Sequence, residues 1–133
     1  GELVSRFYYD RPGLAALALT TDSSILTAIG NDYGYDYTFA RQVEALGKAG
    51  DVLVAISTSG NSPNILRAAE AARQQGIAVV GFTGQGGGKL DAMATHCFRV
   101  PSNETPRIQE GHEFLGHMLC ALIEARMHPR DGA

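Results

Sequence analysis

The sequence predicts a three-layer α/β/α sandwich with a parallel sheet, formed by residues 1–133 as one domain. Short apolar runs alternate along the chain with segments whose apolar residues recur at helical spacing. Two of these runs, at 51–57 and 77–83, are nearly continuous in aliphatic residues, which is typical of strands covered on both faces. Strand and helix repeated in this order favour a parallel sheet with right-handed crossovers.

The candidate strands and helices follow from local patterns. Glycine is expected to end two of the helices, at Gly47 and Gly76. The segment GQGGGKL at 84–90 lacks the first glycine and the final Ser or Thr of a Walker loop, so we expect a flexible loop there. The candidate strands are residues 13–19, 51–57, 77–83 and 96–100, and the candidate helices are residues 38–46, 63–75 and 107–126.

Composition and charge exclude several classes of function. The net charge is −3 and the basic residues are scattered, so neither nucleic acid nor an anionic membrane is an expected partner. No apolar run approaches the roughly 18 residues of a membrane span. Cys97 and Cys120 lack CxxC spacing, which fits reduced thiols in a cytosolic protein. The chain opens at Gly1 without methionine or a signal peptide, and we expect it to be a piece of a longer protein.

The segment ISTSGNSPN at 56–64 places four hydroxyl groups where a strand passes into a helix. Ser62 and Pro63 are typical of the N-cap and first residue of that helix. A helix N-terminus favours an anion, and four hydroxyls exceed what one cap requires, so a phosphate monoester is a candidate ligand. The alternative is a tight turn whose hydroxyls satisfy only the turn. These hydroxyls belong to Ser57, Thr58, Ser59 and Ser62.

A second polar cluster, made of Arg107, Gln109, Glu110 and His117, lies in the otherwise aliphatic last helix. Their spacing places Glu110 within about 20° and Gln109 within about 80° of His117 around the helix axis. The pattern HEFLGH is not a zinc-protease motif, because its histidines are five residues apart and about 140° separates them. A structural histidine is the alternative for His117, and His112 is expected at the surface or an interface.

Three polar segments together resemble one family. They are GNDYG at 30–34, which alone is equally compatible with a surface turn, STSGNSPN at 57–64 and RIQEGH at 107–112. They resemble the sedoheptulose 7-phosphate isomerases, or phosphoheptose isomerases, of the sugar isomerase (SIS) domain superfamily, over essentially the whole chain. The resemblance implies a flavodoxin-like or Rossmann-like SIS domain that is N-terminally truncated, without the family's N-terminal helices and first strand.

The resemblance also implies the site residues. Glu2 matches the glutamate of the family's H-x-x-x-E-L helix, whose histidine would be missing, and Pro106 replaces an aspartate of some relatives. Glu2 is the implied base for proton transfer between C1 and C2 through an enediol, with His117 as acid or proton shuttle. One zinc ion per subunit would be bound by Glu2, Gln109 and His117. The implied substrate-binding residues are Glu2, Asn31, Asp32, Ser57, Thr58, Ser59, Ser62 and Gln109.

The implied protein is a cytoplasmic homotetramer with active sites at subunit interfaces. It would convert sedoheptulose 7-phosphate, a phosphorylated seven-carbon sugar, to D-glycero-D-manno-heptose 7-phosphate for bacterial lipopolysaccharide or other surface glycans. The alternative is a non-enzymatic SIS protein that binds a replication initiator or senses a phosphosugar. The presence of Glu2, Gln109 and His117 favours the enzyme.

Overall fold

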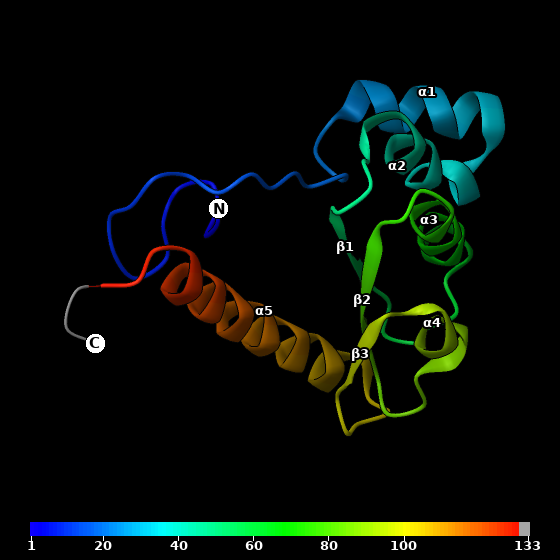
Figure 1. Cartoon of the computed structure of the whole chain (residues 1–133). Coiled ribbons are helices and arrows are strands. Elements are labelled where there is room, and N and C mark those ends of the chain that lie inside the picture. Colours follow the sequence, from blue (N-terminus) through cyan, green and yellow to red (C-terminus); the bar gives the residue numbers. More distant parts are fainter. Residues whose placement is uncertain (131–133) are drawn as a thin grey trace.

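A computed structural model describes residues 1–130 and contains a sheet of three parallel strands with helices on both sides (Figure 1). This arrangement confirms the predicted α/β class. The strands lie in the order β1 (Val52–Ile56), β2 (Ala78–Thr83) and β3 (His96–Arg99). The helices are α1 (Ser23–Tyr33), the 3-10 turn η1 (Tyr35–Tyr37), α2 (Ala40–Leu46), α3 (Pro63–Gln74), α4 (Gly88–Met93) and α5 (Thr105–Met127).

One face of the sheet carries the main hydrophobic core. Ala55 of β1 and Val79 of β2 are buried on this face, together with the alanines of α3. The small alanine side chains let α3 lie close to the strands, and Leu90 of α4 is completely buried in the same cluster. The core therefore fixes the β1–α3 and β2–α4 connections, which are the loops at the carboxyl ends of the strands.

The opposite face is covered at its carboxyl end by α5. The rings of Phe82 and His112 have their centroids 5.6 Å apart, and His112 Nε2 lies 3.1 Å from the Thr83 carbonyl oxygen. His112 is buried, so its predicted place at the surface or an interface is wrong. It lies one helical turn beyond the buried Ile108, on the side of α5 that meets the sheet.

Three segments differ from the predicted elements. Residues 13–19 are not a strand, because they cross from the end of α5 toward α1 and take no part in the sheet described for residues 1–130 (Figure 1). Residues 30–33 form the last turn of α1, a helix that Asp22 caps by accepting the Ile25 N–H at 2.9 Å. Part of the glycine-rich segment predicted as a flexible loop is helical, since α4 begins at Gly88.

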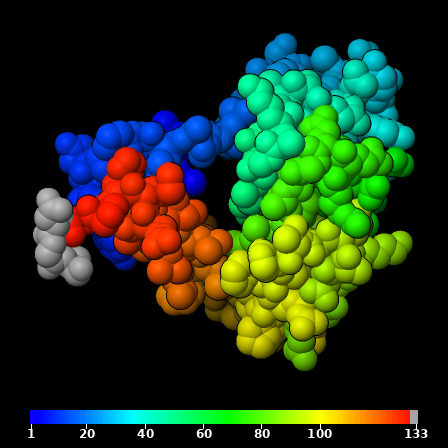
Figure 2. Space-filling view, viewed as in Figure 1, coloured from blue at the N-terminus to red at the C-terminus, as the bar shows by residue number. Residues whose placement is uncertain are grey.

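The first residues of the chain pack against the end of α5 rather than against the sheet. Figure 2 shows this segment, in blue, in contact with the last turns of α5, in red. The Tyr9 hydroxyl donates to the His128 carbonyl oxygen at 2.8 Å, just beyond the helix. Within residues 1–130, no helix combines the length and the apolar character needed to cross a bilayer.

Candidate functional site

The hydroxyl turn after β1 leaves the start of α3 without a side-chain cap. Ser62 occupies the N-cap position as predicted, but its hydroxyl lies 2.8 Å from the hydroxyl of Ser57 and makes no capping hydrogen bond. Ser59 Oγ accepts the Asn61 N–H at 3.1 Å, and Gly60 has a φ of +65° that closes the turn. The helix N-terminus therefore faces the turn uncapped by Ser62, which suits an anion.

The glycine-rich segment at 84–88 packs backbone to backbone on this turn. The Gly60 carbonyl oxygen accepts the Leu90 N–H at 3.0 Å, and Asn61 Oδ1 accepts the Lys89 N–H at 3.1 Å. A Cβ at Gly60 would overlap the Gly87 carbonyl oxygen and lie 2.7 Å from its carbon. The glycines are thus needed for close approach, and the loop holds the turn in shape.

A cavity of about 230 Å³ opens beside the turn. Thr58 and Ser59 of the hydroxyl turn line it, and Ile108 lines it from α5. Polar groups that follow β2 and β3 complete the lining, as expected at the carboxyl ends of parallel strands. The cavity is lined by Thr58, Ser59, Gly84, Gln85, Gly86, Ser102, Asn103, Thr105 and Ile108.

Some lining residues were not found by the sequence reasoning. They are Gln85, Ser102 and Asn103, which follow strands as the hydroxyl turn does. Their place after a strand was the one sequence feature that could have identified them as lining residues. Asn31 and Asp32, predicted to contact substrate, do not line this cavity. They lie exposed at the end of α1, where the Asn31 amide donates to Asp32 Oδ1 at 2.8 Å.

Phe7, from the first residues of the chain, packs against His117, the predicted acid, and Glu2, the predicted base, belongs to the same segment. The ring of Phe7 has its centroid 5.5 Å from that of His117, whose Nε2 lies 3.5 Å from Glu113 Oε1. The pKa of Glu2 is lowered, chiefly by a hydrogen bond from its own backbone N–H and, less, by His117. The carboxylate is ionised at neutral pH, as a general base must be, although the lowered pKa makes it a weaker base.

The charge of Glu2 also affects the pKa of Cys120, which lies about one turn beyond His117 on α5. Burial raises the pKa of the Cys120 thiol, and the Glu2 carboxylate raises it further. The Glu2 carboxylate is thus within electrostatic range of both His117 and Cys120. Both Glu2 and His117 have about half of their side chains exposed, at 46% and 51% respectively, so a substrate can reach them.

The acid–base pair and the hydroxyl cavity lie at different places along α5. Ile108 lines the cavity and His117 follows nine residues later, which is about 14 Å along the helix axis. Gln109 is exposed next to the cavity, eight residues and about 12 Å from His117. The structure thus separates the cavity beside the hydroxyl turn from His117, the predicted acid.

The predicted zinc ligands in this chain provide only part of a typical zinc site. A carboxylate and an imidazole, from Glu2 and His117, are ordinary zinc ligands, whereas the amide of Gln109 is a weak one. Among residues 1–130, no three His, Cys, Asp or Glu side chains come close enough to hold a metal ion. The described residues therefore do not complete a zinc site.

Comparison with known proteins identifies one domain family. The family model described as "SIS domain" matches residues 1–84. The phosphoheptose isomerase of Aneurinibacillus thermoaerophilus is 60% identical over 124 residues, which are 93% of this chain and 63% of that protein. Phosphoheptose isomerase 2 of Campylobacter jejuni is 58% identical over 127 residues, 96% of this chain and 63% of that protein.

Solved structures agree with the sequence comparison. A phosphoheptose isomerase from Francisella tularensis superposes with a TM-score of 0.87 at 44% identity, covering 92% of this chain and 65% of that chain. The enzyme from Neisseria gonorrhoeae gives 0.83 at 53% identity, covering 85% and 63%. This chain therefore spans less than two thirds of the length of these relatives.

Proposed function

The chain belongs to the SIS domain family, and we propose that the protein carrying it is a phosphosugar ketose–aldose isomerase. The substrate is sedoheptulose 7-phosphate and the product is D-glycero-D-manno-heptose 7-phosphate. The observation that carries this proposal is the 60% identity to a relative named phosphoheptose isomerase, over nearly all of this chain. A polar cavity and a carboxylate–imidazole pair give it the chemical groups that the reaction needs.

The reaction moves one proton between C1 and C2 of the sugar through an enediol. Glu2, ionised at neutral pH, takes the proton from C1, and the carbonyl oxygen at C2 gains a proton from His117. The same groups then return a proton to C2 and remove one from the C1 oxygen, leaving the aldose. The hydroxyl turn, at the N-terminus of α3, binds the phosphate and fixes the sugar in place through Ser57, Thr58, Ser59 and Ser62.

The assembly we propose is a homotetramer in the cytoplasm with active sites at subunit interfaces. Two features support it. The phosphate-binding and proton-transfer halves lie about 14 Å apart along α5, so a neighbouring subunit can bring them together. Exposed apolar side chains also remain to be covered, on α5 at Phe114, Met118 and Leu122 and on β1 at Val54 and Ile56.

Zinc is proposed as the metal, with Glu2, Gln109 and His117 as ligands from this chain and at least one ligand from outside residues 1–130. When bound, it would polarise the sugar carbonyl as a Lewis acid. Metal analysis of the purified full-length protein tests this directly: about one zinc per subunit is expected, and its loss in Glu2→Gln is the second expected result. A metal-free protein with full turnover would refute the zinc proposal.

The isomerase proposal is tested by giving the full-length protein sedoheptulose 7-phosphate and following aldose formation, with and without a chelator. Turnover is expected, and Glu2→Gln and His117→Asn should each lower kcat by roughly 100-fold, the lower end of what general acid–base groups contribute. The matched control is Glu70→Gln, because Glu70 is an exposed glutamate on α3 that neither lines the cavity nor belongs to the Glu2–His117 pair. Absence of turnover in both conditions, together with capture of a replication initiator, would refute the proposal.

A further inference from the structure

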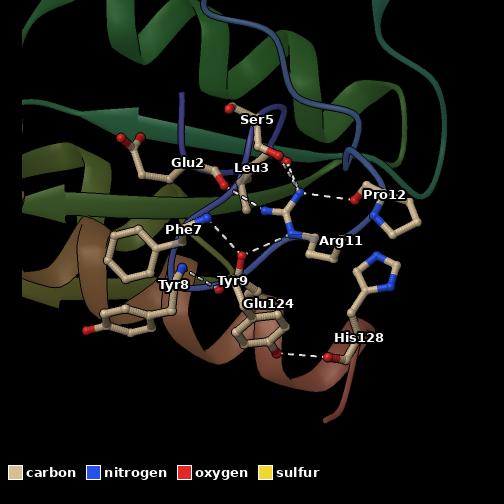
Figure 3. Close-up of polar contacts among 10 residues, drawn as sticks. All are labelled: Glu2, Leu3, Ser5, Phe7, Tyr8, Tyr9, Arg11, Pro12, Glu124 and His128. Carbon is tan, nitrogen blue, oxygen red and sulfur yellow. Dashed lines mark hydrogen bonds and ion pairs between the residues drawn. The ribbon is translucent and has the colours of Figure 1, made fainter.

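One buried carboxylate near the end of α5 has no part in the proton transfer described above. Glu124 is completely buried, and its Oε1 accepts the Phe7 N–H at 2.8 Å while Oε2 accepts the Tyr8 N–H at 2.7 Å (Figure 3). Arg11 Nε donates to Oε1 at 3.0 Å, and the arginine side chain is 3% exposed. Burying a carboxylate is costly, but both oxygens of Glu124 accept hydrogen bonds from the first residues of the chain and so dock that segment on α5.

The guanidinium of Arg11 also donates hydrogen bonds to backbone carbonyl oxygens of the same segment. Nη2 donates to the Glu2 carbonyl oxygen at 2.6 Å, and Nη1 donates to the carbonyl oxygen of Leu3 at 2.6 Å (Figure 3). Longer bonds from Nη1 reach the carbonyl oxygens of Pro12 at 3.1 Å and Ser5 at 3.3 Å. The loop from Glu2 to Pro12 therefore closes around one side chain, and that side chain is bonded to α5.

Helix geometry relates this anchor to the reacting groups. Glu124 follows His117 by seven residues, which places the two side chains on one face of α5, about 20° apart and about 10 Å along the axis. Cys120, whose pKa responds to Glu2, lies between them. Glu124 thus docks the loop on the face of α5 that presents His117, and Arg11 fixes the backbone of the residue that carries the base.

We propose that Arg11 and Glu124 are positioning residues that hold the Glu2 carboxylate beside His117 for proton transfer, an inference that rests on the proposed isomerase function. Neither side chain touches substrate. Their effect should therefore appear in the rate of the chemical step and not in phosphate binding, which uses the hydroxyl cavity at the other end of α5.

The test uses Glu124→Gln in the full-length protein. The amide keeps one acceptor oxygen but turns an NH₂ group toward a backbone N–H or toward Arg11, so at least one hydrogen bond is lost. We expect kcat to fall by about 10- to 100-fold, as a misplacement of about 1 Å does, with KM changed by less than about threefold. Hydrogen exchange of peptides covering residues 1–14 should become about tenfold faster, because these residues open locally.

Two further variants keep the test decisive. Arg11→Lys retains the positive charge beside Glu124 but cannot bond both Glu124 and the Glu2 carbonyl oxygen with a planar fork, so the same two effects are expected. Glu124→Asp retains the charge and should recover part of the lost kcat. Val43→Ala, at a buried core position of α2, is the matched control that lowers stability without changing kcat.

Each outcome has one meaning. Unchanged hydrogen exchange in Glu124→Gln and Arg11→Lys overturns the anchor. Faster exchange with unchanged kcat, in a protein that turns over substrate, overturns the positioning role. A wild-type protein without turnover overturns the isomerase proposal, while the exchange measurement still decides whether Arg11 and Glu124 hold the loop on α5.

Discussion

Gly60→Ala is the sharpest test of the way in which the hydroxyl turn is built. Gly60 has a φ of +65°, which costs an alanine about 1–2 kcal/mol. The new Cβ would also overlap the Gly87 carbonyl group and lie 3.0 Å from Gly88 Cα, and such overpacking costs about 1–3 kcal/mol. The obstructing atoms are backbone held by hydrogen bonds, so they cannot rotate away. The expected loss is about 2–5 kcal/mol in the free energy of unfolding.

Gly50→Ala is the matched control, because Gly50 has a φ of +93° but its Cβ would meet nothing within 4 Å. It should lose only the backbone term of about 1–2 kcal/mol. Urea unfolding measures both: with a slope near 2 kcal/mol/M, the midpoint should fall by about 1–2.5 M for Gly60→Ala and about 0.5–1 M for Gly50→Ala. Equal shifts would show that the turn and the glycine-rich loop are not packed as described.

Two further predictions concern the cavity and the anchor. Ser59→Ala should raise KM for the sugar phosphate by about 10- to 100-fold, which is what the loss of one hydrogen bond to a charged group costs. The control is Ser24→Ala, at an exposed position of α1, which should leave KM unchanged. Equal KM values for the two variants would show that Ser59 does not bind the phosphate. For Glu124, burial raises the pKa, but the hydrogen bonds from Tyr8 and Phe7 and the Arg11 guanidinium outweigh burial, so the pKa lies below its ordinary value of 4.5. Because the folded-state pKa is lowered, the stability from this carboxylate is complete above pH 4.5 and is lost as the pH falls through the lowered value. The difference in urea midpoint between wild type and Glu124→Gln should therefore shrink below pH 4.5, and a constant difference would refute the assignment.

Local sequence patterns were enough to predict most of the sheet and the hydroxyl turn. The aliphatic runs around β1 and β2 and the Ser62-Pro63 start of α3 each depend on neighbours a few residues away. Periodicity and capping preferences describe such neighbours well. The same reasoning placed the carboxyl ends of the strands as the site of ligand binding, and the cavity lies there.

Contacts between residues far apart in sequence could not be predicted in this way. Residues 13–19 have the composition of a strand, but their course is set by the docking of the preceding residues on α5, and Arg11 and Glu124 are separated by 113 positions. His112 has no local signal for burial, because its partner is the Thr83 carbonyl oxygen at the end of β2. Burial of a polar group depends on a partner that the local pattern does not contain.

The position of His117 follows from contacts on both sides of it along a single rigid helix. α5 contains 23 residues, about 34 Å of continuous helix, and a Cβ at Gly111 would lie 2.7 Å from Val100 Cγ2. This close approach, together with the contact of His112 with the Thr83 carbonyl oxygen, fixes the first half of α5 on the sheet beside the cavity. Glu124 fixes the loop that carries Glu2 on the second half. His117 lies between these two contacts, so a change at Gly111 alters the position of His117 relative to the cavity, and a change at Glu124 alters the position of Glu2 relative to His117.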